Sequence, residues 1–361
     1  MRKPTTFENI IVGGGLAGLS CAYWLIKNGN KSVALINNGT IISSNGDNHL
    51  SDALSGSLSY LYQIYRKKGI DTVVEIISTF NENIDLVEKE LNLVERESYV
   101  NLFKVGTINH FEEGSMKEIG FYQSFINELI KRNVKIREVK NPNFRYGVEF
   151  FHEADFETIS FIRKIMEVIK DKVYVFEDQK CVSLTRDMDK VIVRTNLGDE
   201  LAGKNVIFAN SNTLATFLPE LREKLIFADS YLLKYKTDKN IFGFSNYANQ
   251  NKHQYHLKLS DGFYFAGHSD LDDEYSGIDE SSAKTKFDNF CETNALTSSE
   301  LENIKVSKIA FSKDGHVLVG RSVKNPNLYY VGGFSGQSKL TAFKSGRDLV
   351  SLIYGPLKRA S

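Results

Sequence analysis

The pattern of apolar and polar positions is clearest near the start of the chain. A short apolar run over residues 10–12 is typical of a strand that is buried on both faces. After a run of glycines, apolar residues return at helical spacing, and a second apolar run covers residues 31–36. The pattern therefore predicts a strand, a helix and a parallel strand over residues 9–37.

Later regions of the chain show both kinds of periodicity. Apolar residues at helical spacing predict helices over residues 60–93, 114–132 and 156–170. Alternation and turn signals predict a strand pair over 98–110 and antiparallel strands over 225–268. A charged helical region over 279–304 follows, and a strand, a glycine-rich turn and a helix close the chain over 328–353. These elements predict a mixed α and β architecture.

The glycines between the first strand and the first helix have the spacing of a dinucleotide-binding turn. Gly13 allows the tight turn, Gly15 lets the backbone approach a pyrophosphate, and Gly18 allows close packing of helix and strand. The pyrophosphate then lies on free N–H groups at the start of the helix, at Leu16 and Ala17. A purely structural glycine turn is the alternative, and the strand–turn–helix context favours nucleotide binding.

Asn37 ends the second strand, where a dinucleotide site usually has a carboxylate for the ribose hydroxyls. An asparagine accepts a hydrogen bond but lacks the charge and the second oxygen, and it repels a 2′-phosphate less than a carboxylate does. Alternatively, Asn37 caps a turn with Asn38 and Gly39. The two interpretations are compatible.

Composition narrows the class of protein. The chain has 361 residues, of which 42% are hydrophobic and 25% charged, as in an ordinary soluble globular protein. Its 45 basic and 45 acidic residues give a formal net charge of zero, which argues against general nucleic-acid binding but leaves a local basic patch open. No apolar run reaches the ~18 residues of a membrane-spanning helix, and the chain leads at once into its first strand without a separate signal peptide.

Three widely spaced cysteines, Cys21, Cys181 and Cys291, form no CxxC pair and no metal-binding spacing. We therefore expect no metal site and reduced thiols, as in a cytoplasmic protein. A polar stretch over residues 38–59 interrupts the predicted α/β elements, and a long loop of this kind is usually functional or mobile.

The order of elements resembles the D-amino-acid oxidase/glycine oxidase superfamily of FAD-dependent oxidoreductases over nearly the whole chain. Six features carry the resemblance: the Gly13 turn, the Val182 segment, the strand over 205–210, the Asp261-Gly262 strand pair, the Asp314-Gly315 segment, and the closing strand–turn–helix. The resemblance implies an α/β fold in which a Rossmann-like FAD-binding domain is interleaved with an α+β substrate domain built on an antiparallel sheet.

The implied domains are discontinuous in sequence. The FAD-binding domain would comprise residues 1–80, 150–220 and 305–361. The substrate domain would comprise residues 81–149 and 221–304.

The resemblance also implies which residues contact a flavin. The closing glycine-rich turn and helix start would lie beside the isoalloxazine, with contacts from Gly332, Gly333, Gly336, Gln337, Ser338 and Lys339. Reduced flavin is anionic, so a helix N-terminus and the Lys339 ammonium would stabilise it. The alternative for these glycines is a simple strand-to-helix turn. Other implied FAD contacts are Val182 through its backbone near the adenine, Ala209, and three residues of the polar loop, Ser44, Asn45 and Asn48.

The chain departs from the family pattern at several positions. Asn37 replaces the ribose carboxylate, and Ala209-Asn210 stands where a small residue and glycine are usual. The stretch over 308–314 lacks the arginine that commonly pairs with a substrate carboxylate, and it lacks the cysteine used for covalent flavin attachment. We therefore expect non-covalent FAD and an altered substrate pocket.

The expected reaction is oxidation of an amino acid or another small amine by hydride transfer to flavin N5, which depends mainly on orientation. The substrate would lie between the strands of 225–268 and the flavin. Tyr255 and Tyr264 are candidates to hydrogen-bond it; if the opposite strand face meets the ligand, His256 or Lys258 would bind an anion. His49 is a candidate proton shuttle and Arg321 a candidate carboxylate clamp, although each is equally consistent with an ordinary surface role.

Two other functions are compatible with this sequence. One is a flavin-binding protein with a binding or assembly role and little redox turnover, which Asn37 and the missing arginine suggest. The other is amine oxidation on a modified tRNA base, which neutral overall charge makes less favoured. A nicotinamide-dependent hydroxylase is less favoured still, because its Gly-Asp motif is missing before the last helix. Oligomeric state stays open.

Overall fold

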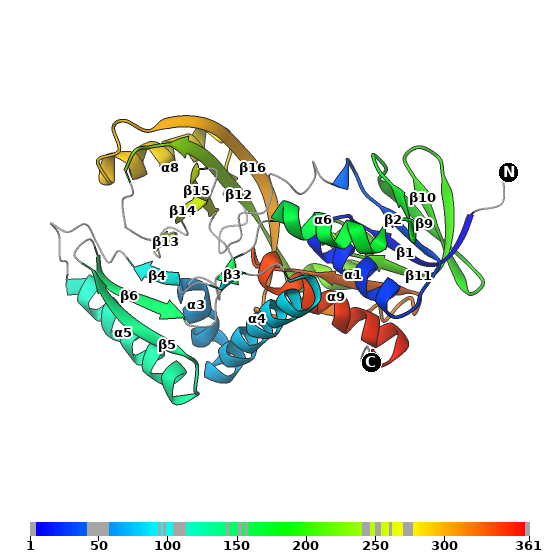
Figure 1. Cartoon of the computed structure of the whole chain (residues 1–361), viewed down its shortest axis with the longest axis horizontal. Coiled ribbons are helices and arrows are strands. Elements are labelled where there is room, and N and C mark those ends of the chain that lie inside the picture. Colours follow the sequence, from blue (N-terminus) through cyan, green and yellow to red (C-terminus); the bar gives the residue numbers. More distant parts are fainter. Residues whose placement is uncertain are drawn as a thin grey trace.

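The computed structural model describes residues 5–41, 58–92, 95–96, 99–103, 113–141, 144–150, 154–155, 158–239, 246–249, 254–259, 262–269 and 277–357. Figure 1 shows a largely parallel sheet towards one end of the long axis and antiparallel strands towards the other. Segments from the beginning, middle and end of the chain meet in the parallel sheet. The predicted fold class, with its interleaved chain, is confirmed.

The parallel sheet positions the predicted dinucleotide site. Its strands are β1 (Thr5–Val12), β2 (Val33–Ile36), β8 (Val173–Phe176), β9 (Cys181–Asp187), β10 (Lys190–Thr195), β11 (Glu200–Phe208), β17 (Leu318–Arg321) and β18 (Leu328–Gly332). The order is β17-β18-β11-β1-β2-β8, with the β9–β10 hairpin attached to β11. Strands β18, β11, β1, β2 and β8 run parallel, so their carboxyl ends meet at one edge of the sheet.

Three helices share a hydrophobic core with this sheet: α1 (Leu16–Lys27), α6 (Thr158–Ile169) and α9 (Ser338–Tyr354). Helices α1 and α9 pack closely, because a Cβ added at Gly346 would lie 2.8 Å from the Ser20 carbonyl carbon. The Trp24 indole Nε1 donates to the Phe343 carbonyl at 2.9 Å across this contact. The first and last helices of the chain are therefore neighbours, as Figure 1 shows. The other face carries α7 (Ser211–Phe217) and the 3₁₀ helix η1 (Pro219–Lys224).

The antiparallel sheet has the order β13-β14-β15-β12-β16. Its strands are β12 (Leu225–Lys236), β13 (Asn246–Asn249), β14 (Gln254–Leu259), β15 (Gly262–His268) and β16 (Glu300–Ser312). Helix α8 (Glu280–Thr293) covers one face, where Tyr231, Leu233 and Phe265 pack against Phe287. Because side chains alternate along a strand, Tyr264 of β15 lies on the other face.

A third hydrophobic cluster packs against helix α9. It contains the helices α3 (Leu58–Lys68), α4 (Ile70–Leu91) and α5 (Glu113–Lys131), whose apolar faces pack together with Leu340 of α9. Nearby short strands are β3 (Glu95–Arg96), β4 (Tyr99–Phe103), β5 (Ile136–Asn141), β6 (Phe144–Phe150) and β7 (Ala154–Asp155). Helix α4 contacts both this cluster and the core around α1, through Val87 and Leu91.

Two predicted helical regions differ in the structure. Residues 60–93 form two helices, because Gly69 has a φ of +87°, a left-handed value that ends α3. The region 279–304 forms α8 only up to Thr293, and its last residues begin strand β16. In both regions, apolar residues keep a helical spacing beyond the residue at which the helix ends. The helices predicted over 114–132 and 156–170 are confirmed as α5 and α6.

The predicted domain boundaries fall inside regular elements. The boundary between residues 80 and 81 lies within α4, the one between 149 and 150 within β6, and the one between 304 and 305 within β16. The exact division of the chain into domains stays a prediction.

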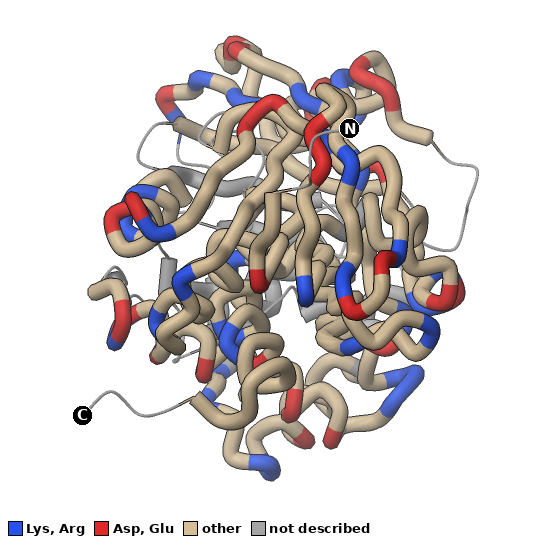
Figure 2. The backbone as a smooth tube through the Cα atoms, turned by 90° about the vertical axis from the view of Figure 1, so that its right-hand side faces the viewer, with Lys and Arg blue, Asp and Glu red and all other residues tan. Residues whose placement is uncertain are grey.

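Charged residues of both signs are interspersed along the chain in the view of Figure 2. This agrees with the formal net charge of zero. Among the described residues, no helix combines the length and apolar character needed to cross a membrane.

A polar network ties the last helix to the first strand. The Asn9 amide Nδ2 donates to the Tyr354 hydroxyl at 2.7 Å, and that hydroxyl donates to Glu8 Oε1 at 3.1 Å. Asn205 Nδ2 donates to Asn9 Oδ1 at 3.1 Å, and Asn9 also bonds Asn30. Because Asn9 and Asn205 are buried, these bonds offset the cost of removing their amides from water.

We expect Tyr354→Phe to lower the free energy of unfolding by about 1–3 kcal/mol, because it leaves the buried Asn9 amide short of a partner. Burial, with Glu8 nearby, raises the pKa of Tyr354 to about 12. Its folded-state pKa therefore exceeds the unfolded value of about 10, so its contribution is present below pH 10 and is lost as pH rises towards 12. Urea denaturation at pH 7 and pH 11 measures both effects, with the exposed Tyr174→Phe as control. Equal stability of the Tyr354 and Tyr174 variants would contradict the prediction.

Candidate dinucleotide and substrate site

The first glycine turn joins β1 to α1 with very little space. Gly13 has a φ of +113°, and a Cβ added there would lie 2.9 Å from Asn210 Cβ and 3.1 Å from the Ala209 carbonyl. A Cβ added at Gly18 would lie only 1.7 Å from the Gly13 carbonyl oxygen. The Ala209 N–H donates to the Val12 carbonyl at 2.9 Å and holds the end of β11 against the turn. Glycine at positions 13 and 18 is therefore a steric requirement.

Helix α1 begins where a pyrophosphate would bind. Its N-cap is Gly15, no side chain caps its first turn in the described structure, and that turn contains no acidic residue. Leu16 and Ala17 are buried, so apolar side chains surround the N-terminal N–H groups. A helix N-terminus favours an anion beside it, and this one lies at the carboxyl edge of the parallel sheet.

Asn37 braces this turn from the neighbouring strand. Its Oδ1 accepts from the Gly14 N–H at 3.0 Å, and its Nδ2 donates to the Gly39 carbonyl at 2.9 Å. A Cβ at Gly14 would lie 2.8 Å from Asn37 Cγ, so the two residues are in close contact. The amide thus caps the turn to Gly39 and fixes the glycine turn at the same time. Both sequence interpretations of Asn37 are compatible with this geometry.

The backbone of Asn37 is also bonded to the segment that precedes β9. The Gln179 N–H donates to the Asn37 carbonyl at 2.9 Å, and Gln179 Nε2 donates to Asp199 Oδ2 at 2.9 Å. Gln179 Oε1 is buried and has no hydrogen-bond partner within the described part of the chain. Val182, at the start of β9, has 48% of its surface exposed. The structure therefore gathers the glycine turn, Asn37, Ala209 and the Val182 segment at one edge of the sheet.

Gln179 was missed in the sequence analysis. The sequence could have indicated this residue, because it is a polar residue just after the carboxyl end of a parallel strand, at the edge where ligands bind in this fold class.

The second glycine turn joins β18 to α9. Gly333 and Gly336 have φ values of +68° and +78°, and Ser335 has a left-handed φ of +54°. The Ser335 N–H donates to the Ala310 carbonyl at 3.0 Å, and its Oγ accepts from the Ser312 N–H at 3.1 Å. These bonds tie the turn to the end of β16, which offsets the strain of a left-handed serine.

Helix α9 also begins without a side-chain cap in the described structure. Its N-cap is Gln337, its first turn has no acidic residue, and Lys339 in that turn is only 6% exposed. A helix N-terminus and a buried ammonium both favour a negative charge next to them. Gly332, Gly333, Gly336, Gln337 and Ser338 are consecutive or nearly so with Lys339, so the structure brings this predicted set together.

The substrate-side candidates lie on the antiparallel sheet. Tyr264 is 8% exposed, and its ring centroid is 5.8 Å from the Lys234 ammonium. In the strand register Tyr255 lies opposite Ala266, two positions along from Tyr264. The backbone therefore places both tyrosines at neighbouring positions of β14 and β15.

His268, at the end of β15, was not among the predicted site residues. Its Nδ1 lies 2.6 Å from the Ser269 carbonyl, and because a carbonyl only accepts, Nδ1 carries the hydrogen. Its ring centroid is 4.9 Å from that of Phe311, which forms a β-bridge with Phe334 of the second glycine turn. The sequence could have indicated this residue, because His268 and Tyr264 are an even number of positions apart in one strand and so share a face of the sheet.

Arg321 lies away from these groups. It is exposed, its Nε donates to the Pro326 carbonyl at 2.6 Å, and its guanidinium lies 5.7 Å from the Tyr329 ring centroid. In the β17–β18 pair Leu318 is opposite Gly332, whereas Arg321 is opposite Tyr329 at the other end. The structure does not bring Arg321 to the second glycine turn. His49, Ser44, Asn45 and Asn48 lie outside the described residues.

In the described ranges, no group of three or more His, Cys, Asp and Glu side chains could hold a metal ion. The strand–glycine turn–helix unit and its uncapped helix N-terminus instead define an α/β protein of the dinucleotide-binding class. The model of the FAD dependent oxidoreductase family, DAO, matches residues 9–352, and the chain belongs to this family. It is an FAD-dependent oxidoreductase, and FAD is its cofactor.

Solved structures with the same fold share little sequence with the chain. L-proline dehydrogenase from P. horikoshii is 14% identical, with a TM-score of 0.72 over 99% of this chain and 95% of that chain. Glycine oxidase from Geobacillus kaustophilus is 12% identical, with a TM-score of 0.71 over 99% and 100%. L-amino acid deaminase from Proteus vulgaris is 13% identical, with a TM-score of 0.73 over 100% and 96%. No curated protein matches the sequence.

Proposed function

We propose that this protein oxidises an amino acid or another small amine, with FAD bound non-covalently. The observation that carries the proposal is the pair of glycine turns that lead from the carboxyl ends of β1 and β18, strands of the parallel sheet, into the N-termini of α1 and α9. When bound, FAD supplies the hydride acceptor for the amine. The solved structures of the same fold include a proline dehydrogenase, a glycine oxidase and an amino acid deaminase, which supports an amino acid as the substrate.

The described residues fit FAD at both ends. The turn of Gly13, Gly15 and Gly18, with the N–H groups of Leu16 and Ala17, would hold the pyrophosphate. The orphaned Gln179 Oε1 would accept a hydrogen bond on the adenosine side, next to Asn37, Val182 and Ala209.

At the other end, the turn that contains Gly332, Gly333 and Gly336 leads into α9. The N-terminal residues Gln337 and Ser338, together with the Lys339 ammonium, would stabilise the negative charge of the reduced ring.

Non-covalent binding is supported by the state of the thiols. Burial raises the pKa of both Cys21 and Cys181 to about 12, so neither is a thiolate at neutral pH. The third cysteine, Cys291, lies in α8, and burial raises its pKa to about 11. Because the thiolate is the nucleophilic form, none of the three cysteines is activated to form a covalent bond with a flavin.

The substrate would lie between the second glycine turn and the face of the antiparallel sheet that carries Tyr264. Tyr255, Tyr264 and His268 would orient the amine so that its C–H bond points at the flavin. The His268 ring, held at Nδ1 by the Ser269 carbonyl, would contribute a polar group to this side of the substrate site.

An anaerobic absorbance experiment tests this function. Purified holoenzyme is expected to show a flavin spectrum that bleaches on addition of one member of a panel of amino acids and secondary amines. Readmission of air then distinguishes an oxidase, whose flavin reoxidises at once, from a dehydrogenase. A bound flavin that no amine reduces, although dithionite does, would overturn the proposal and support a binding or assembly role.

A further inference from the structure

Asn83 of α4 makes an unusual contact with the backbone of α9. Its Nδ2 donates to the Lys339 carbonyl at 2.9 Å, and its Oδ1 accepts from the Lys344 N–H at 2.9 Å. These two backbone groups are five residues apart, so they are not partners of one another in an α-helix. The Asn83 side chain is fully buried. One amide therefore spans the first and second turns of α9.

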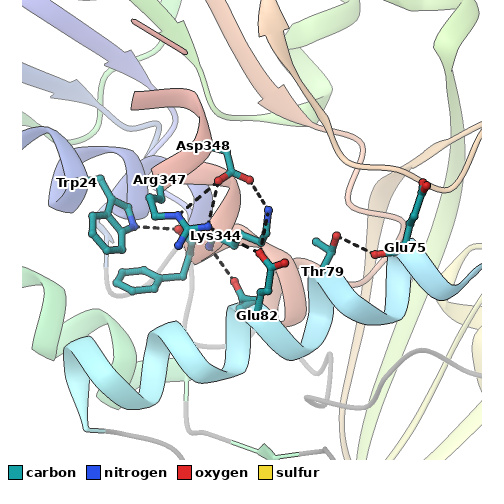
Figure 3. Close-up of polar contacts among 9 residues, drawn as sticks. Trp24, Glu75, Thr79, Glu82, Lys344, Arg347 and Asp348 are labelled. Carbon is teal, nitrogen blue, oxygen red and sulfur yellow. Dashed lines mark hydrogen bonds and ion pairs between the residues drawn. The ribbon is translucent and has the colours of Figure 1, made fainter. Parts of the chain in front are cut away.

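The surrounding contacts hold the same part of α9 from both sides. Glu82 of α4 lies 3.5 Å from the Lys344 ammonium and 3.8 Å from Arg347, and Lys344 also pairs with Asp348 at 2.6 Å (Figure 3). From the α1 side, Trp24 donates to the carbonyl of the residue before Lys344. Glu82 thus binds side chains of α9, whereas Asn83 binds its backbone.

A buried asparagine is a costly way to stabilise a helix contact. An apolar residue of similar size packs without a desolvation cost, and a buried amide is neutral only when its bonds are well made. The advantage of Asn83 is that its two hydrogen bonds fix the position of the first turns of α9 along and around the helix axis. That turn carries Lys339, which is buried at the N-terminal end of the helix.

We propose that Asn83 is a positioning residue for the flavin end of α9. It holds the first turn, and with it the N–H groups and the Lys339 ammonium, at the distance from which they stabilise the negative charge of a reduced flavin. This inference rests on the proposed function only in placing the flavin ring beside α9. Its effect is exerted through the backbone of Lys339, since Asn83 bonds the carbonyl of that residue.

The test compares Asn83→Leu with Asn83→Asp in the holoenzyme. Leucine keeps the branching of asparagine and removes both bonds, but it is bulkier at this fully buried position. Aspartate keeps an acceptor for the Lys344 N–H but has no donor for the Lys339 carbonyl, and it adds a negative charge. We expect both variants to lower the midpoint potential of the bound flavin, aspartate more than leucine because it adds a negative charge. We also expect the FAD dissociation constant to rise about tenfold, as for loss of one buried hydrogen bond.

Glu82→Gln is the matched control on the adjacent residue, because it weakens the ion pairs to Lys344 and Arg347 without touching the backbone of α9. Its potential and FAD affinity should equal those of the wild type. Urea denaturation of each apoprotein reports a purely structural role. Variants at position 83 that lose stability but keep the wild-type potential and FAD affinity would overturn the inference.

The potential is measured with a chemical reductant, so the result does not depend on finding an amine substrate. A wild-type flavin that no amine reduces refutes the proposed function but leaves the comparison of potentials valid. If the leucine variant fails to fold, Asn83→Ala decides the outcome, because it removes both bonds without adding bulk or charge.

Discussion

Replacing Gly18 with alanine is expected to weaken FAD binding about a hundredfold and to destabilise the fold. The added Cβ would lie 1.7 Å from the Gly13 carbonyl oxygen, and the contact is with backbone, so no side-chain rotation relieves it. Helix α1 must move away from β1, and its N-terminal N–H groups move with it. A misplacement of about 1 Å can cost about a hundredfold in a positioned site, and we expect a loss of that order in FAD affinity.

The stability cost of Gly18→Ala should be about 1–3 kcal/mol, the range for an overpacked core. Gly120→Ala is the matched control, since Gly120 also lies inside a helix, α5, and an added Cβ there meets nothing within 4 Å in the described structure. That variant should be as stable as the wild type or more stable by up to about 1 kcal/mol, because alanine favours helix. Isothermal titration of the apoproteins with FAD and urea denaturation measure both quantities. Wild-type FAD affinity in Gly18→Ala would show that this turn does not hold the cofactor.

The sequence was most informative where structure follows from neighbouring residues. The strand–helix–strand unit at the start of the chain has two clear periodicities and a glycine turn whose steric demands are local, and the structure confirms it. The same approach failed at Gly69, because a lone glycine is tolerated within a helical pattern and only its left-handed φ of +87° reveals a break. Periodicity identifies the apolar face of a helix better than its ends.

Contacts between distant segments could not be predicted in this way. The interest of His268, Gln179 and Asn83 comes from a partner far away in sequence, which lies in β16, at the end of β2 and in α9 respectively. A single sequence contains no signal that pairs α4 with α9. Arg321 shows the opposite kind of error, in which closeness in sequence was misleading. It directly follows Gly320, but in the antiparallel β17–β18 pair it lies opposite Tyr329, at the far end of β18 from Gly332.

The family resemblance supplied what periodicity could not. It indicated that the first and last glycine turns contribute to one cofactor site although more than 300 residues separate Gly18 from Gly332. The structure explains this by placing β1, β11 and β18 side by side and by packing α1 on α9. Whether Asn37 contacts the ribose or only braces the turn has to be tested, since its side chain is bonded to Gly14 and Gly39.

Asn37→Ala is therefore the second informative variant. It removes the acceptor of the Gly14 N–H and the donor to the Gly39 carbonyl, so the glycine turn loses its brace from β2. At about 1 kcal/mol for each hydrogen bond, the FAD dissociation constant should rise about tenfold to a hundredfold. Asn38→Ala is the matched control, because the neighbouring Asn38 is exposed. Fluorescence titration of the apoproteins with FAD measures the affinities.

Asn37→Asp then separates the two roles of this residue. Aspartate keeps an acceptor for the Gly14 N–H and adds a second oxygen and a charge for the ribose hydroxyls, while it loses the donor to Gly39. If bracing the turn is the main role, Asn37→Asp weakens FAD binding by only about fivefold, because the Gly14 bond is kept and only the Gly39 bond is lost. If the ribose contact limits affinity, the added carboxylate tightens FAD binding. FAD affinity unchanged in both variants would exclude Asn37 from the cofactor site, and the adenosine would then depend on Gln179 and the Val182 segment.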